Sequence, residues 1–281
     1  MWNARLAFLF IYIHSMMKTV VITGSSKGFG LEMGKEFLNQ GYHVAFSGSN
    51  EQHLNRAISS ITFDGEKVAA VLCDVRNRGD LQNLWDVIFK KWGRIDLWIN
   101  NAGVAQKAEK IWHSSTADIK NIFDINLLGA FYGTQVAVNG MLNQGFGKVY
   151  NTVGFGSTGM IRTGLNLYGT SKHAVAHFTK AFANELKGTG IIVGTLQPGM
   201  MVTDFVNASK GSIYNKSEVQ NIYNILGDLP DVPAKYLVKK MIDNNTNGKL
   251  LTWLSSAKVI FRFIKHLFVK RDLFKSDAHQ K

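Results

Sequence analysis

Tyr168 and Lys172 stand four residues apart in a stretch with a helical pattern, so their side chains share one helix face. A free phenol has a pKa of about 10, which makes it a weak acid near neutral pH. An ammonium group held nearby favours the phenolate and lowers that pKa, and the pair then suits proton transfer. This spacing also occurs by chance on many helices. The surrounding elements must therefore decide whether the pair does chemistry.

A second candidate lies near the start, where KTVVITGSSKGFGLEMGKEFLNQG runs from a strand through a glycine-rich turn into a helix. Gly24 allows the tight turn, Gly28 lets backbone N–H groups approach a pyrophosphate, and Gly30 lets the helix pack closely on the strand. The helix N-terminus adds positive potential. The segment predicts a dinucleotide site, whose further contacts are Ser26, Lys27 and Phe29.

The end of the second predicted strand bears on which dinucleotide binds. HVAFSGSN carries Ser47, Gly48 and Ser49 where a carboxylate would bind the ribose 2′-hydroxyl of NAD. No acid at these positions repels a 2′-phosphate, and Lys27 offers a cation to one. We therefore expect NADP(H) in preference to NAD(H), with Ser49 among its contacts; the alternative for Lys27 is a solvated turn residue.

Short β-branched runs alternate with helical patterns along the chain, which predicts a doubly wound α/β fold with a parallel sheet. The expected strands lie near 19–23, 43–47, 68–73, 95–99, 148–153, 190–196 and 249–254. Three prolines, no repeats and no low-complexity linker leave no internal domain boundary. We expect a single Rossmann-type domain over 18–255.

Five motifs in order resemble the short-chain dehydrogenase/reductase family in its shorter, single-domain form. They are Thr23-Gly-Ser-Ser-Lys-Gly-Phe-Gly30, Asn100-Asn-Ala-Gly103, Asn126, Tyr168-Gly-Thr-Ser-Lys172 and Pro198-Gly-Met-Met-Val-Thr203. The resemblance covers residues 18–205 closely and thins afterwards, where the family's substrate lobe varies.

The resemblance implies further cofactor contacts. Asp74 would bind the adenine amino group with Val75 beside it, and Thr203 would meet the nicotinamide carboxamide. The other positions that the resemblance assigns to the cofactor are Asn101, Ala102, Gly103, Pro198 and Gly199. The alternative for Asn100 to Gly103 is a turn that braces the sheet, and the two roles are compatible.

The resemblance also implies carbonyl chemistry, with Tyr168 as general acid/base, Lys172 as its activator and ribose ligand, and Asn126 as the anchor of a proton-relay water. The family's catalytic serine aligns with Gly154 in NTVGFGSTG, which has no hydroxyl. The Gly-x-Gly-Ser arrangement is similar to the chlorophyll b reductase-like branch. We therefore expect Ser157 to polarise the substrate carbonyl, with Thr158 in reserve and Thr152 less suited.

Charge is unevenly spread: the chain has a net charge of +12, and residues 231–281 hold eleven Lys/Arg against four Asp/Glu. No nucleic-acid motif accompanies it, so we expect no nucleic-acid partner. His173 and His177 lack a third ligand, and we expect no metal. The single cysteine, Cys73, indicates a reducing, cytoplasmic setting.

Both ends carry apolar segments. Residues 1–17 contain an apolar run too short to span a membrane, and they are either an upstream extension that is not native or a weak anchor. The basic extension 256–281 contains KVIFRFIKHLFVKR, a strongly amphipathic helix pattern. It either packs on the body of the protein or a sister subunit, or rests on anionic lipid as a peripheral membrane contact.

We expect an NADPH-dependent reductase of a small carbonyl substrate, or the corresponding alcohol dehydrogenase, that forms a homodimer or homotetramer by resemblance. A substrate lid over 205–230 would favour an apolar ligand such as an acyl chain, terpenoid, steroid or pigment. Two alternatives are a non-catalytic NADP(H) sensor, suggested by Gly154, and a reductase of 3-oxoacyl groups on an acidic carrier protein, suggested by the basic C-terminus.

Overall fold

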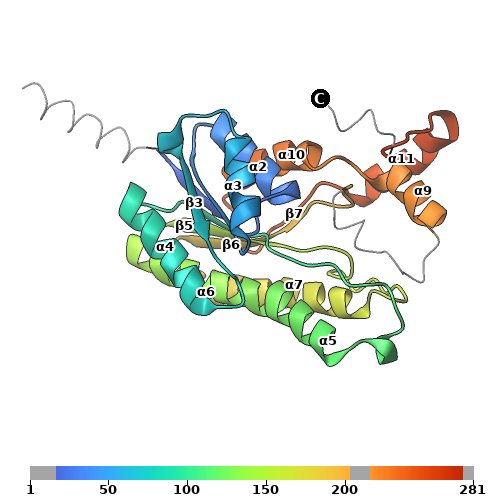
Figure 1. The fold of residues 1–281 in the computed structure, drawn as a ribbon, viewed down its shortest axis with the longest axis horizontal. Helices are drawn as coiled ribbons and strands as arrows, with labels where there is room; N and C mark the ends of the chain where they lie inside the picture. Colours follow the sequence, from blue (N-terminus) through green and yellow to red (C-terminus); the bar gives the residue numbers. More distant parts are fainter. Residues whose placement is uncertain (1–16, 203–215, 275–281) are drawn as a thin grey trace, which may run out of the picture.

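One parallel sheet forms the centre of the computed structural model, which describes residues 17–202 and 216–274 (Figure 1). Its seven strands run in the order β3-β2-β1-β4-β5-β6-β7. They are β1 (Thr19–Ile22), β2 (His43–Gly48), β3 (Val68–Leu72), β4 (Leu97–Asn100), β5 (Gly147–Thr152), β6 (Ile191–Gln197) and β7 (Leu250–Thr252). The predicted doubly wound α/β fold is confirmed, and each predicted strand range overlaps an observed strand.

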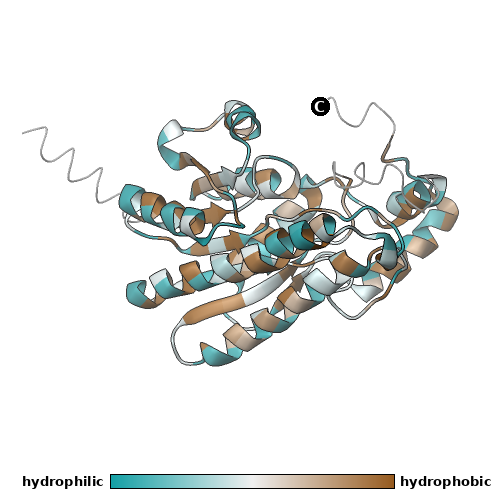
Figure 2. Cartoon of the chain, turned by 60° about the horizontal axis from the view of Figure 1, so that its bottom comes forward, coloured by the Kyte–Doolittle hydropathy of each residue, from teal (hydrophilic) through white to brown (hydrophobic). Residues whose placement is uncertain are grey.

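Helices cover both faces of this sheet, as buried parallel strands require. One face carries α2 (Gly28–Asn39), α3 (Glu51–Ser59) and α10 (Asp231–Asp243), and the other carries α4 (Arg78–Trp92), α6 (Gly129–Gln144) and α7 (Asn166–Glu185). Two apolar cores fill the layers between sheet and helices. In Figure 2, hydrophobic residues in brown mark the segments that line the sheet, and hydrophilic residues in teal run along the outer helices.

The remaining elements lie around the carboxyl edge of the sheet and at one end of the molecule, except that η1 (Gly65–Lys67) directly precedes β3 at the amino edge. The others are η2 (Ile111–His113), α5 (Thr116–Phe123), the π-helical turn η3 (Asp124–Leu128), α9 (Lys216–Leu226) and α11 (Ser256–Phe268). In Figure 1, α9 and α11 lie beyond the strand ends, at the right of the view.

Strand β1 pairs with both β2 and β4, so the chain reverses its direction across the sheet between them. In doubly wound sheets a ligand crevice opens at the carboxyl ends of two such strands. The segments after β1, β4, β5 and β6 all leave the sheet at this edge. The motifs of the sequence are therefore brought to one place.

A buried polar network fixes two helices to the centre of the sheet. Asn100 Nδ2 donates to Asn151 Oδ1 at 2.8 Å and to Thr134 Oγ1 at 3.1 Å, and Trp98 Nε1 donates to Asn100 Oδ1. Asn151 Nδ2 donates in turn to Thr179 Oγ1 at 2.9 Å. Thr134 belongs to α6 and Thr179 to α7, so hydrogen bonds from two adjacent strands set the position of both helices.

We expect Asn151→Leu to lower the free energy of unfolding by roughly 2–4 kcal/mol, because it leaves the Asn100 amide and two threonine hydroxyls short of partners in the interior. Denaturant unfolding followed by circular dichroism measures the change. Asn83→Leu, on the exposed side of α4, is the control and should stay within about 0.5 kcal/mol of the wild type. Equal effects of the two substitutions would contradict the role of the network.

Candidate active site

The glycine turn after β1 has the shape of a phosphate cradle. Gly24 and Gly28 have φ angles of +61° and +56°, which favour glycine over all other residues. A Cβ on Gly24 would lie 2.6 Å from the Cα of Ala102, and one on Gly30 would meet the carbonyl of Gly24. The sequence prediction of three glycines with separate geometric duties therefore matches the backbone.

The first turn of α2 leaves N–H groups for an anion. Its N-cap residue, Lys27, makes no side-chain cap hydrogen bond, and the turn has no acidic residue. Such a helix N-terminus combines orphan N–H donors with positive potential. The residues present fit the pyrophosphate of a dinucleotide; Phe29 itself is buried against the apolar core behind the turn.

Asn101 and Ala102 brace this turn from β4. Asn101 Nδ2 donates to the carbonyl oxygens of Thr23 and Gly24 at 3.2 and 3.1 Å, and the N–H groups of Asn101 and Ala102 donate to Thr23 Oγ1. The side chain of Asn101 is thus used to shape the cradle. The bracing role, which sequence reasoning held as an alternative, is what the structure displays.

The end of β2 separates a structural serine from an exposed one. Ser47 is buried, and its hydroxyl donates to the carbonyl of Ile22 at 3.2 Å. Ser49 is exposed at the strand end. The side chain of Ser26 lies close to Gly48, the residue between Ser47 and Ser49. No carboxylate occupies 47–50, and Lys27 is exposed on the adjoining turn. This corner accordingly suits a ribose that carries a 2′-phosphate.

Of the remaining predicted cofactor positions, all but Thr203 lie within the residues that the structure describes. Asp74 pairs with Arg76, whose hydrogen bonds lower the pKa of the carboxyl group, and Val75 packs beneath it against Gly129. Pro198 is buried after β6, and Gly199 follows with φ +82°. Thr203 and the lid residues up to 215 lie outside the described residues.

Tyr168, Lys172 and Asn126 meet beside Gly103 at the ends of β4 and β5. A Cβ placed on Gly103 would lie 3.3 Å from Asn126 Oδ1 and 3.5 Å from Lys172 Nζ, so both groups reach the same point. Lys172 Nζ donates to the carbonyl of Thr152 at 3.0 Å and lies 5.9 Å from the centroid of the Tyr168 ring. The i, i+4 geometry predicted from the sequence is present.

The π-helical turn η3 aims Asn126 at this point. Its side chain accepts from the N–H of Val104 at 2.8 Å and donates to the carbonyl of Val104 at 3.0 Å. Such turns insert one extra residue into a helix and are frequent at functional sites. The amide of Asn126 therefore holds the loop after β4, and its role as a water anchor stays a prediction.

Burial dominates the titration of the pair and differs from the sequence expectation. It raises the pKa of Tyr168, with Tyr223 raising it further, and it lowers the pKa of Lys172 to about 8. Burial disfavours the charged forms of both groups, the phenolate of Tyr168 and the ammonium of Lys172. The expected lowering of the phenol pKa by Lys172 is thus not seen in the protein alone.

The loop after β5 explains why a glycine stands at 154. A Cβ on Gly154 would overlap the hydroxyl oxygen of Tyr168, and one on Gly156, at φ +88°, would overlap the Cα of Gly169. The loop therefore lies directly on the first turn of α7, and a side chain at position 154 would require the phenol of Tyr168 to shift.

Ser157 lies in the same turn, which closes with a hydrogen bond from its N–H to the carbonyl of Gly154 at 3.2 Å. It is buried, whereas Thr158 is exposed. Thr152 is half-buried within β5, and its hydroxyl has no hydrogen-bond partner among the described residues. Ser157 is thus a buried hydroxyl on the loop that touches the tyrosine; its catalytic role stays a prediction.

Two further residues contact the site, of which Gln106 was not predicted and Tyr223 falls within the predicted substrate lid. Gln106 is buried, and its Oε1 accepts from the N–H of Tyr168 at 3.0 Å, which fixes the orientation of the amide. Its Nε2 is a buried donor without a hydrogen-bond partner among the described residues. Tyr223 of α9 is close enough to raise the pKa of Tyr168. No local motif marks either residue, because both arrive through tertiary packing.

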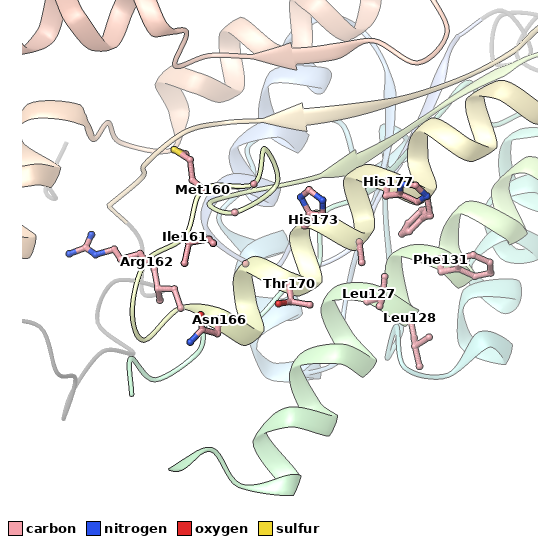
Figure 3. Close-up of a pocket in the computed structure, with 16 residues that line it drawn as sticks. Leu127, Leu128, Phe131, Met160, Ile161, Arg162, Asn166, Thr170, His173 and His177 are labelled. Atoms are coloured by element: carbon pink, nitrogen blue, oxygen red, sulfur yellow. The ribbon is translucent and has the colours of Figure 1, made fainter. Parts of the chain in front are cut away.

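A groove of about 770 Å³ lies on the outer side of α7 and not at the tyrosine hydroxyl (Figure 3). Leu127, Leu128 and Phe131 line one side, and His173 and His177 project from α7 on the other. Within residues 17–202 and 216–274 no cluster of three metal-ligating side chains is present. None of the catalytic candidates lines this groove, although Gly156 beside Ser157 does.

The buried ammonium of Lys172 makes a pH-dependent prediction. Burial lowers its pKa from 10.5 to about 8, so the folded chain binds fewer protons than the unfolded chain between about pH 8 and 10.5. Its contribution to stability therefore improves as the pH rises through that window. We expect the melting temperature of Lys172→Met minus that of the wild type to be more positive at pH 7 than at pH 10. Lys90→Met, exposed on α4, should show an offset that does not change with pH.

Curated relatives share most of this chain. The probable chlorophyll(ide) b reductase NYC1 of Arabidopsis thaliana, a chloroplastic protein, is 29% identical over 265 residues, which are 88% of this chain and 52% of NYC1. The chloroplastic chlorophyll(ide) b reductase NOL of Oryza sativa subsp. japonica is 32% identical over 259 residues, 88% of this chain and 74% of NOL. The chain spans about half the length of NYC1.

A bacterial relative and a solved structure extend the comparison. The NADP-dependent 3-hydroxy acid dehydrogenase YdfG of Escherichia coli K12 is 29% identical over 189 residues, 67% of this chain and 75% of YdfG. The structure described as ElxO with NADP bound superposes with a TM-score of 0.75 at 26% identity, over 84% of this chain and 97% of ElxO.

The family described as short chain dehydrogenase has a sequence model that matches residues 18–212. The match contains the glycine turn, the Asn100 segment and the Tyr168–Lys172 pair. The same segments meet at the carboxyl edge of the sheet. The chain therefore belongs to the short chain dehydrogenase family.

Proposed function

We propose that this protein is an NADPH-dependent reductase that converts a carbonyl group of a small apolar substrate to an alcohol. The observation that carries the proposal is the convergence of Tyr168, Lys172 and Asn126 at the edge of the sheet where the glycine turn also lies. An acid/base group beside a dinucleotide cradle is what hydride transfer to a carbonyl requires.

A bound nicotinamide cofactor supplies the hydride. Tyr168 then donates its phenolic proton to the oxygen of the reduced carbonyl, and the nearby ammonium of Lys172 stabilises the phenolate that remains. Lys172 has three donors, of which the carbonyl of Thr152 takes one, so the others are available to a ribose hydroxyl. Ser157 donates to the substrate carbonyl as negative charge develops on it.

The cofactor choice rests on two independent supports. The corner formed by Ser26, Lys27 and Ser49 lacks a carboxylate that would repel a 2′-phosphate. ElxO binds NADP, and YdfG is an NADP-dependent enzyme by its name. NADP(H) over NAD(H) is accordingly part of the proposal.

The substrate class follows from the residues near the tyrosine. Tyr223 approaches it from α9, and Ile222, Ile225 and Leu226 share that helix. Aromatic and aliphatic side chains around few polar groups are typical of sites for apolar ligands. The chlorophyll(ide) b reductases among the relatives act on a large apolar pigment by their name, which supports an apolar carbonyl compound here.

The two alternatives differ in their structural support. A non-catalytic NADP(H) sensor draws support from Gly154, since the aligned position has no hydroxyl. The carrier-protein alternative loses some of its attraction, because Arg262 and Arg271 of the basic C-terminus are engaged inside the protein. Turnover of free carbonyl compounds would exclude the sensor, and turnover of carrier-bound but not free 3-oxoacyl groups would favour the carrier-protein alternative.

An oligomer through the outer side of α6 and α7 is also part of the proposal. Leu128 and Phe131 are exposed there beside the groove, and a second subunit would cover them. A molecular mass of a single chain, measured by light scattering, would rule out this oligomer. A cytoplasmic location stays a prediction, and the NYC1 and NOL relatives are chloroplastic by their names.

Tyr168→Phe should abolish NADPH oxidation with ketones and aldehydes, because the proton donor is removed. Ser157→Ala should lower kcat by about a hundredfold through loss of a donor to the developing oxyanion. Absorbance at the nicotinamide band follows turnover, and thermal unfolding checks that each variant is folded. Thr158→Ala, exposed one residue further on, is the matched control and should retain activity.

Full activity in Ser157→Ala would move carbonyl polarisation to another group, with the buried Nε2 of Gln106 next in order. NADPH binding without turnover in the wild type across a broad panel would favour the sensor.

Ser49→Asp should weaken NADPH binding by roughly tenfold or more and leave NADH binding nearly unchanged, because a carboxylate at the strand end repels the 2′-phosphate. Quenching of protein fluorescence on titration with each nucleotide gives the two dissociation constants. Ser60→Asp adds the same charge at the far end of α3 and should change neither. A parallel loss of both affinities would remove the 2′-phosphate from this corner.

A further inference from the structure

Helix α11 turns its charged side toward the protein and its apolar side away from it. Lys258, Val259, Arg262 and His266 are the partly buried positions of the helix. Ile260, Phe261, Ile264, Leu267 and Phe268 are exposed to 62, 62, 53, 79 and 82%. Among the described residues, α11 therefore packs on the body of the protein through its charged side, and its apolar side is left uncovered.

Buried ion pairs lock this orientation. Arg262 donates to Asp228 at 2.7 and 2.9 Å, and the two side chains are only 11% and 7% exposed. Arg262 also donates to the carbonyl of Leu226, the last residue of α9. Trp253 Nε1 donates to the same carboxylate at 2.7 Å. Rotating α11 to bury its apolar side would remove Arg262 from the buried carboxylate of Asp228, which is strongly unfavourable.

The segment after the helix strengthens the attachment. Arg271 donates to the carbonyls of Asn224 and Gly227 at 3.1 and 2.7 Å, and the ring of Phe274 meets that of Tyr223 edge to face. The helix is thus held at both ends against α9. Its outer side stays presented as a fixed apolar strip, and Figure 2 shows brown residues at this end of the molecule.

Charges around the strip select among occupants. Lys265 and Lys270 are exposed beside it, and Asp272 is the one acidic residue in 256–274. A second copy that docked through the same strip would bring identical lysines together, since a two-fold contact pairs the same patch with itself. An apolar side flanked by lysines is instead the pattern of helices that lie in the interface of anionic membranes.

The length of the helix fits the same occupant. Its 13 residues extend about 20 Å, short of the roughly 20 residues that a membrane span needs. No helix in the described ranges is long and apolar enough to cross a bilayer. A helix of this length is suited to contact in the plane of the membrane surface.

We propose that the outer side of α11 is a docking surface for an anionic lipid membrane. Leu267 and Phe268 enter the boundary between headgroups and acyl chains, and Lys265 and Lys270 contact the acidic headgroups. The proposal concerns binding alone and does not depend on the reductase activity.

Co-sedimentation of the full chain with vesicles of phosphatidylcholine, with and without phosphatidylserine, tests it. We expect binding to anionic vesicles that Phe268→Glu weakens by roughly tenfold. Trp112→Glu makes the same change of charge at an exposed aromatic residue of η2, and it should bind like the wild type. This pair of variants also separates α11 from the apolar run in residues 1–17, which both retain.

Absence of binding to anionic vesicles would overturn the proposal, as would equal losses in the two variants. A dimer in light scattering that Phe268→Glu dissociates, without vesicle binding, would assign the strip to a second copy. Lys265→Glu combined with Lys270→Glu should abolish the preference for anionic over neutral vesicles, and its persistence would contradict the role of the lysines. Thermal unfolding confirms that each variant keeps its fold.

Discussion

Everything at the active edge depends on the buried hydrogen bonds between Asn100 of β4 and Asn151 of β5. These two amides bind Thr134 and Thr179, and so place α6 and α7 on the sheet. The two helices carry Asn126 at the entrance of α6 and Tyr168 and Lys172 at the start of α7. Polar groups are costly in an apolar interior unless all are paired, so this network permits one arrangement of strands and helices. The positions of Tyr168 and Lys172 therefore depend on a buried polar cluster between the sheet and its helices.

A second constraint is space around the tyrosine. The loop from Gly154 to Gly159 lies so close to α7 that a side chain at 154 would displace the phenol. The glycine at the position aligned with the family's serine is therefore consistent with the close approach of the loop. Burial by this loop and by α9 raises the pKa of Tyr168 and lowers that of Lys172. A closely packed site makes both charged forms costly until compensating charges surround them.

Much of this could be predicted from the sequence, because the relevant signals are local. Strand and helix periodicity gave the order of elements, and the glycine turn carries its φ requirements in its residue types. The i, i+4 spacing placed Lys172 beside Tyr168 once the helix was recognised. Gln106 escaped prediction, because its contact with Tyr168 joins segments 62 residues apart in the chain. The direction in which α11 faces also escaped it, since periodicity shows that a helix has two sides and not which side meets the protein. The ion pair between Arg262 and the carboxylate of Asp228 sets that direction.

Asp228 lies at the centre of the contacts that hold this end of the molecule together. It joins Trp253, Arg262 and Arg271, and its backbone pairs with the segment after β6. The attachment of α9 is thus largely polar, but it also includes the ring of Tyr223, which contacts Phe274. The same tyrosine raises the pKa of Tyr168. A substitution at Tyr223 would therefore change the surroundings of Tyr168 and the attachment of the C-terminal segment together.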